Sequence, residues 1–164
     1  MIIVGGMSLG VMVALSMKKR VEELRQLERI LNYIQGELSY KNSILKEAFY
    51  EASFRTKPPF DKWLIAIKEL IEESEDMTFF EIWEKSLIVL RGESHLKRED
   101  ISELMNIGQT LGYLDVSAQQ MGLALEKDNL HSNIVRLDKG LLNNMKVAVI
   151  LGILGGIFLV VVLV

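Results

Sequence analysis

The sequence predicts an all-α protein in which an antiparallel bundle of about six helices lies between two transmembrane helices. Three observations lead to this prediction. The chain of 164 residues begins and ends in runs without a charged residue, at residues 1–17 and 147–164. All 19 Lys and Arg and all 22 Asp and Glu therefore lie in residues 18–146. There the apolar residues recur every three or four positions, as in helices, and no stretch alternates as a strand would.

The C-terminal run contains only apolar residues and glycine. A helix of its 18 residues is about 27 Å long, close to the ~30 Å thickness of a bilayer's hydrocarbon core. A helix also satisfies its own backbone hydrogen bonds, which lipid cannot do. We therefore expect a transmembrane helix. A buried core helix is the alternative, although it would be unusually uniform for a domain of this size.

The N-terminal run is followed at once by three basic residues, at positions 18–20. A cleavable signal peptide is the alternative here, and residues 14–16 offer a small-residue cleavage site. Signal peptides carry their basic residues before the apolar run, so a retained span is favoured. Basic residues flank the middle segment at both ends, and the termini have none. The positive-inside rule then places residues 18–146 in the cytoplasm as one domain.

Six helices are expected between the spans, at about residues 21–38, 44–54, 59–71, 78–90, 97–111 and 117–146. The first carries a strict apolar seam at Leu24, Leu27, Leu31, Ile34 and Leu38. No helix-breaking residue separates this helix from the first span, so one helix can run through both. Pro58 and Pro59 separate the second helix from the third, because proline suits a helix start but not its interior.

The later helices carry their own start and stop signals. Thr78 and Glu81 have the spacing of a capping box at the start of the fourth helix. Gly112 suits the left-handed position that follows the end of the fifth helix. Either Asp115 or Ser117 can cap the sixth, and Ser117 would do so in a second capping box, with Gln120.

The residues that carry chemistry in enzymes are sparse. There is no cysteine, which excludes disulfides and fits a reducing compartment. The two histidines, His95 and His131, have no helix-spaced partner of ligand type, and no phosphate-binding loop or zinc spacing is present. The mild net charge of −3 argues against nucleic acid as a partner. We therefore expect no catalytic activity, cofactor or metal.

One acidic concentration leaves an alternative open. Carboxylates at this density can hold a calcium ion or simply form a solvated face, and the second interpretation is preferred. The residues concerned are Glu69, Glu72, Glu73, Glu75, Asp76, Glu81 and Glu84.

Each expected span contains two glycines four residues apart. These pairs are Gly6 with Gly10 and Gly152 with Gly156. Glycine lets helix backbones approach closely in a membrane. The pairs predict that the spans pack against each other or against partner subunits, with self-association left open.

Three separated motifs resemble the stage III sporulation protein AB family. Residues 107–119 (IGQTLGYLDVSAQ) resemble its Leu-Gly-x-x-Leu-Gly-x-x-Asp-x-x-x-Gln segment, with Ile107 in place of the first Leu. GELSY at residues 36–40 and SILKEA at 43–48 resemble its Glu-Ile-x-Tyr and Thr-Pro-Leu-x-Glu-Ala. LGILGG at 151–156 resembles part of its second span. The change from Thr-Pro to Ser-Ile affects the turn after Tyr40.

The resemblance implies a protein of endospore-forming bacteria that acts in a channel-like complex between mother cell and forespore. It implies a domain similar to the cytoplasmic domain of type II secretion protein F, the platform of secretion machines. The protein would lie in the mother-cell membrane (the outer forespore membrane), with its domain in the mother-cell cytoplasm. Its partners would be other stage III sporulation proteins, including a hexameric ATPase.

The motifs also supply candidate partner-binding residues. These are Glu37, Tyr40, Gly108, Gly112, Asp115 and Gln119. The glycines have a competing structural role in close helix packing, and Asp115 has one as a helix cap.

The leading interpretation is thus a non-catalytic membrane platform. A membrane-anchored subunit of a small-solute transporter is one alternative, but Ser8 and Ser16 are the only polar side chains in the two runs. A membrane-tethered enzyme or metal-dependent regulator that uses the acidic stretch is the other.

Overall fold

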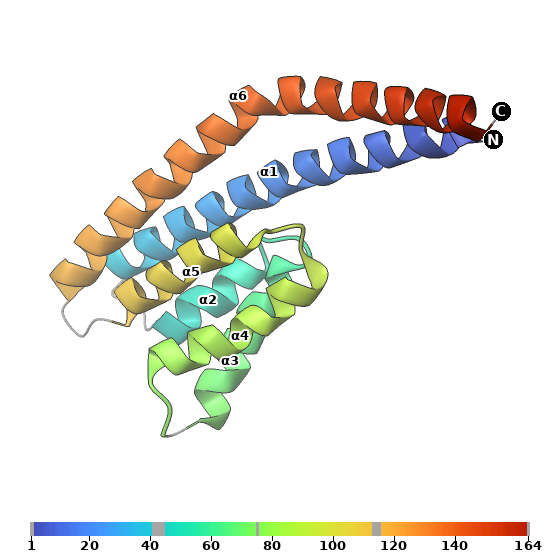
Figure 1. The fold of residues 1–164 in the computed structure, drawn as a ribbon. Coiled ribbons are helices and arrows are strands. Elements are labelled where there is room, and N and C mark those ends of the chain that lie inside the picture. The colour runs from blue at the N-terminus through green and yellow to red at the C-terminus, as the bar shows by residue number, and fades with distance from the viewer. Residues whose placement is uncertain (1, 41–44, 75, 113–115, 164) are drawn as a thin grey trace. The chain divides into compact units, whose positions relative to one another are not determined.

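The computed structural model describes residues 2–40, 45–74, 76–112 and 116–163, and within them the chain is helical without a strand (Figure 1). The six helices of this part are α1 (Ile2–Tyr40), α2 (Leu45–Ser53), α3 (Phe60–Glu73), α4 (Phe79–Glu93), α5 (Arg98–Leu111) and α6 (Val116–Leu163). The all-α prediction is confirmed. The prediction that one helix runs on from the N-terminal apolar run is confirmed as well, because α1 is continuous.

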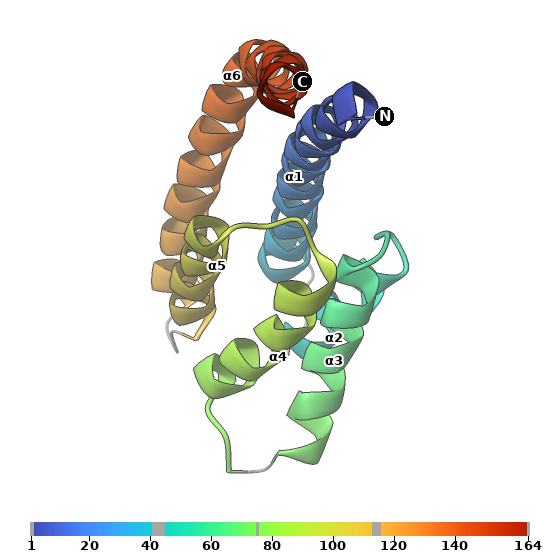
Figure 2. The ribbon, with the colours of Figure 1, turned by 45° about the vertical axis from the view of Figure 1, so that its right-hand side comes forward.

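The chain forms two compact units, and α1 and α6 belong to both. Residues 23–132 make up the first unit, which contains all of α2 to α5. In it α2 packs on α3, α3 on α4 and α4 on α5, with consecutive helices running in opposite directions (Figure 2). The expected antiparallel arrangement is therefore present in this unit. The second unit consists of the chain before Glu23 and after Ser132.

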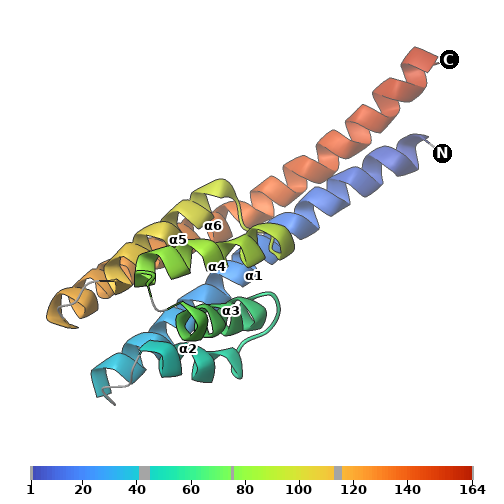
Figure 3. The ribbon, with the colours of Figure 1, turned by 90° about the horizontal axis from the view of Figure 1, so that it is seen from below.

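In the second unit the first part of α1 and the last part of α6 run alongside each other, with both chain ends at the same end (Figures 1 and 3). Within the described residues, no helix combines the length and apolar character required to cross a membrane. The spans expected at residues 1–17 and 147–164 are thus not found, and the first and last residues of the chain lie outside the description.

Aromatic residues fill the core of the first unit. The rings of Trp63 and Trp83 meet edge to face with centroids 5.0 Å apart, and both side chains are fully buried. A buried indole N–H needs an acceptor. Trp63 Nε1 donates to Ser86 Oγ over 2.9 Å, and Trp83 Nε1 donates to the Leu104 carbonyl over 2.7 Å. These bonds fix the orientation of both rings and explain why a serine is buried.

The apolar seam predicted for α1 faces this core. Leu24, Leu27, Leu31 and Ile34 are at most 1% exposed. The side of α1 next to this seam makes polar contacts that the sequence did not suggest. His95 Nδ1 lies 2.8 Å from Glu23 Oε1, and His131 Nδ1 lies 2.7 Å from Glu28 Oε1. Both histidines therefore hold α1 against the rest of the first unit.

The capping box predicted for α4 is confirmed, the left-handed position predicted for Gly112 is wrong, and one of the two caps predicted for α6 is wrong. Thr78 caps α4 in a capping box, with its hydroxyl 3.3 Å from the Glu81 N–H and its own N–H 2.7 Å from the Glu81 carboxylate. Gly112 is the C-cap of α5 and lies in the right-handed region, at φ −78° and ψ −5°, with its N–H directed at the last carbonyls of that helix. Ser117 lies inside α6, so it is not its cap. Asp115, the other cap candidate, lies outside the described residues.

The capping box makes stability depend on pH. The backbone N–H of Thr78, and after it the hydroxyl, hold the pKa of Glu81 below its ordinary value of 4.5. The stabilisation is complete above the pKa of Glu in the unfolded chain, and it is lost as pH falls through the lower pKa of the folded state. We expect Glu81→Gln to lower the thermal midpoint more at pH 7 than at pH 3. Glu84→Gln, on an exposed residue of the same helix, is the charge-matched control, and an equal effect at both pH values would contradict the assignment.

Candidate partner-binding site

Most of the candidate residues come from one end of the first unit. There α1 ends, α5 ends and α6 begins (Figures 1 and 3). A hydrogen bond of 2.5 Å from Lys127 Nζ to Gln35 Oε1 joins α6 to α1 near this end. The structure thus places the first turns of α6 beside the last turns of α1.

Gly108 serves the packing of α5 on α4. It is buried, and a Cβ atom built on it would lie 2.2 Å from Cδ1 of Trp83. Such a contact is far inside van der Waals distance, so the ring of Trp83 occupies the space that any side chain would need. Gly108 therefore contacts the core and presents nothing to a partner.

Gln119 serves the connection between α5 and α6. Its Nε2 donates a hydrogen bond of 2.6 Å to the carbonyl of Leu111, the last residue of α5. The last carbonyls of a helix lack partners within the helix, so this amide supplies one of them. Gly112, the C-cap residue, is exposed beside it. Both residues thus shape the corner from which α6 starts.

A glycine that the sequence did not single out lies at the same corner. A Cβ atom built on Gly122 of α6 would lie 2.6 Å from Cγ2 of Thr110 on α5. The two helices therefore cross closely here, and Gly122 permits it. The signal in the sequence was weak, because an isolated glycine in a helical pattern has many explanations.

The remaining candidates are less well defined. Glu37 is half-buried on α1 and already interacts with another group of the chain. Tyr40 is the last residue of α1, and its side chain and the whole of Asp115 lie outside the description. Of the span glycines, Gly152 is half-exposed on α6, and the surroundings of Gly6, Gly10 and Gly156 are not described. The predictions that these residues bind partners or pack spans stay predictions.

The structure shows one exposed apolar surface that the sequence pattern did not predict. The outer side of the first turns of α6 is apolar and exposed at four residues: Ala118, Met121, Ala124 and Leu125. Met121 is 78% exposed and Leu125 is 61% exposed, one turn apart on the same face. We call these four residues the α6 apolar face. Apolar residues grouped on a surface mark contact sites for proteins or membranes.

One carboxylate of the acidic stretch, that of Glu72, is paired with two lysines. Glu72 lies 3.0 Å from Lys68 Nζ and 3.3 Å from Lys46 Nζ, and hydrogen bonds from Lys68 and then Lys46 lower its pKa. Among the described residues, no three His, Asp or Glu side chains lie close enough together to hold a metal ion. The stretch therefore has the features of a solvated face with exposed ion pairs.

The described part of the chain is thus a helical bundle with the motif residue Gly108 buried in its packing and an apolar helix face on its outside. The chain belongs to the Stage III sporulation protein AB family, whose family model matches residues 1–164. It is 25% identical over 145 residues to Stage III sporulation protein AB of Bacillus subtilis (strain 168), which covers 88% of this chain and 84% of that protein. The resemblance seen in the motifs is confirmed, and it supports a role in sporulation.

A solved structure confirms the fold. The structure of a Stage III sporulation protein AB (SpoIIIAB) is similar with a TM-score of 0.70 at 22% identity. The similar part covers 76% of this chain and 97% of the other. At this identity the likeness speaks for the arrangement of the helices and for nothing beyond it.

The structural role of Gln119 can be tested directly. We expect Gln119→Ala to lower the free energy of unfolding by about 1 kcal/mol, because the Leu111 carbonyl loses a partner at a partly buried site. Urea unfolding of the full-length protein in detergent measures this effect. Gln120→Ala, at the neighbouring position, is the matched control. Equal stability of the two variants would show that the hydrogen bond contributes nothing.

Proposed function

We propose that the protein is a non-catalytic, membrane-attached platform of the stage III sporulation complex. Its helical domain would lie in the mother-cell cytoplasm and bind another component of the complex, by analogy with type II secretion protein F the ATPase. The observation that carries this proposal is the α6 apolar face. Fold analogy alone is a weak basis for function, so the proposal depends on this surface.

The α6 apolar face fits a protein partner better than solvent. Met121 and Leu125 lie one turn apart, the spacing at which helical side chains enter a partner's groove together. Methionine adapts its shape to irregular contacts. Gln119 and Gly122 hold the start of α6 against α5. The α6 apolar face is therefore held in a fixed position before the partner binds, so less conformational entropy is lost on binding.

Membrane attachment is supported by the exposed apolar residues near both chain ends. On α1 these include Met12, Val13 and Leu15, which are 47–67% exposed. On α6 they are 46–71% exposed and comprise Val147, Ile150, Leu151, Leu154, Ile157, Phe158 and Val161. This much exposed apolar surface is unfavourable in water and favourable in lipid. We propose that both segments lie in the mother-cell membrane.

Cell fractionation and cysteine labelling test the attachment. The chain has no cysteine, so Ser132→Cys, on an exposed residue, introduces a single thiol. We expect the protein to stay in the membrane pellet after alkaline carbonate extraction. A membrane-impermeant thiol reagent should label the variant only after the mother-cell membrane is permeabilised. Release by carbonate would contradict attachment, and labelling in intact cells would contradict a cytoplasmic domain.

A further inference from the structure

A pocket of about 460 Å³ lies where α4 leads into α5. Three cationic side chains line it: Arg91 at the end of α4, Lys97 before α5 and Arg98 at its start. Leu96, Ile101 and Met105 form its apolar wall. The structure describes all the residues that line the pocket, and none of these is acidic. The pocket thus combines positive charge with an apolar wall.

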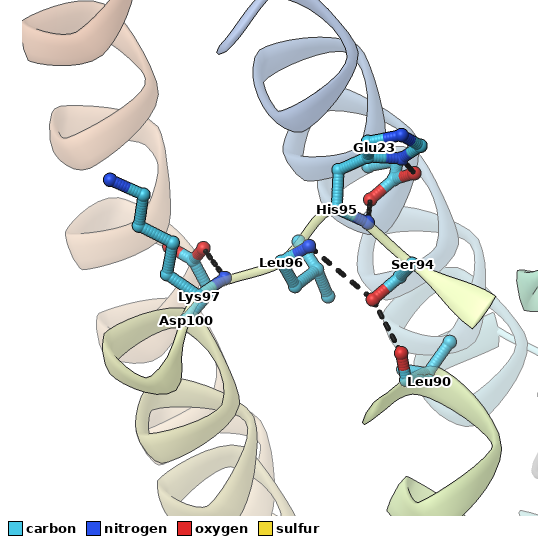
Figure 4. Close-up of polar contacts among 7 residues, drawn as sticks. All are labelled: Glu23, Leu90, Ser94, His95, Leu96, Lys97 and Asp100. Atoms are coloured by element: carbon cyan, nitrogen blue, oxygen red, sulfur yellow. Dashed lines mark hydrogen bonds and ion pairs between the residues drawn. The ribbon is translucent and has the colours of Figure 1, made fainter. Parts of the chain in front are cut away.

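Two of these cations, Lys97 and Arg98, destabilise the helix α5 at whose start they lie. A helix N-terminus carries partial positive charge, so Lys97 and Arg98 are unfavourable there. Lys97 takes the N-cap position, where its ammonium cannot accept a hydrogen bond from the backbone. Asp100 offsets part of this cost by accepting the Lys97 N–H over 2.7 Å (Figure 4). Residues that break a local rule of stability are expected where function requires them.

The connection between α4 and α5, which lines the pocket, is hydrogen-bonded to α1. The Glu23 carboxylate accepts the His95 N–H over 2.7 Å and lies 2.8 Å from His95 Nδ1 (Figure 4). Glu23 follows the apolar run at residues 1–17 by six positions. Six residues of helix advance about 9 Å, and a fully extended chain advances about 21 Å at most. If the run lies in the membrane, Glu23 lies within about 21 Å of it along the chain, so the connection bonded to Glu23 is within roughly two to three Debye lengths of the lipid.

We infer that this pocket binds the headgroup of an anionic phospholipid in the membrane to which the protein is attached. Arg91, Lys97 and Arg98 contact the phosphate group. The apolar wall receives the glycerol and first acyl carbons. The inference rests on the proposed membrane attachment.

Native mass spectrometry of the full-length protein in non-ionic detergent tests the inference, with phosphatidylglycerol and phosphatidylcholine as probes. We expect the protein to retain phosphatidylglycerol in preference. The triple variant Arg91→Gln, Lys97→Gln and Arg98→Gln should lose at least about tenfold in this preference, because each cation near an anionic surface contributes about fivefold. The matched control is Lys46→Gln, Lys68→Gln and Lys85→Gln, which removes the same charge away from the pocket. The control should retain the preference.

Each outcome is decisive. Equal retention of the two lipids, or an unchanged preference in the pocket variant, would overturn the inference. Displacement of phosphatidylglycerol by millimolar inorganic phosphate would also overturn it, because the pocket would then be a site for a soluble anion. Thermal unfolding of the variants shows whether they are folded, and Lys97→Gln alone provides a milder second test. Carbonate extraction of the wild type separately tests membrane attachment, so failure of one proposal is distinguishable from failure of the other.

Discussion

Replacement of Gly108 with alanine is expected to destabilise the helical bundle by about 1–3 kcal/mol, the usual cost of inserting a carbon into a packed core. The new Cβ atom would lie 2.2–2.6 Å from three atoms of the Trp83 ring. The ring cannot easily withdraw, because its N–H donates to the Leu104 carbonyl and the ring meets Trp63 edge to face. Either α5 must move away from α4 or the aromatic core must repack.

Urea unfolding followed by tryptophan fluorescence measures this effect, since the only two tryptophans both lie in the core. Gly36→Ala is the matched control. Gly36 also lies within a helix, but a Cβ atom there meets nothing within 4 Å. The control should be unchanged or stabilised by about 0.5–1 kcal/mol, because alanine is the better helix former. Equal stability of both variants would show that α4 and α5 are not packed as described.

The paired substitution Met121→Glu and Leu125→Glu is expected to abolish most sporulation without unfolding the protein. Both side chains are exposed, so their replacement should change the free energy of unfolding by no more than about 0.5 kcal/mol. Two charges placed on an apolar contact surface must be desolvated when the partner binds. Loss of a binding hot spot costs about 2 kcal/mol or more, roughly 30-fold in affinity.

The count of heat-resistant spores measures this effect in a strain that expresses the variant in place of the wild-type protein. Ile88→Glu is the control, because Ile88 of α4 is 67% exposed but lies outside the α6 apolar face. Protein levels must be equal in the three strains. A normal spore count for the double variant, or an equal loss for Ile88→Glu, would argue against this surface as the contact site.

The helices of this chain follow from local signals in its sequence. The seam from Leu24 to Ile34, the proline pair before α3 and the Thr78 capping box each acted as expected. Errors arose where a residue type suits more than one position. Gly112 has the identity of a left-handed cap but is a right-handed C-cap of α5, and the Gln119 side chain donates to the Leu111 carbonyl at the same helix end.

The candidate site was harder to predict than the helices, because it depends on what lies beside each residue. The role of Gly108 is set by the ring of Trp83, 25 positions earlier in the chain. Nothing in the periodic pattern marks Met121 and Leu125 as a contact surface, and only the packing of α6 shows that they are exposed together. The bonds from Glu23 to His95 and from Glu28 to His131 join residues far apart in sequence. A periodic pattern identifies an apolar face but not the partner that covers it.

Site-specific photo-crosslinking from position 125 in sporulating cells tests the central claim most directly. A photoreactive amino acid replaces Leu125 in one strain and Ile88 in another, and products are identified by mass spectrometry. The account predicts a crosslink from position 125 to the ATPase of the stage III complex, and none to it from position 88. The absence of any protein crosslink from position 125, in cells that sporulate normally, would contradict the account.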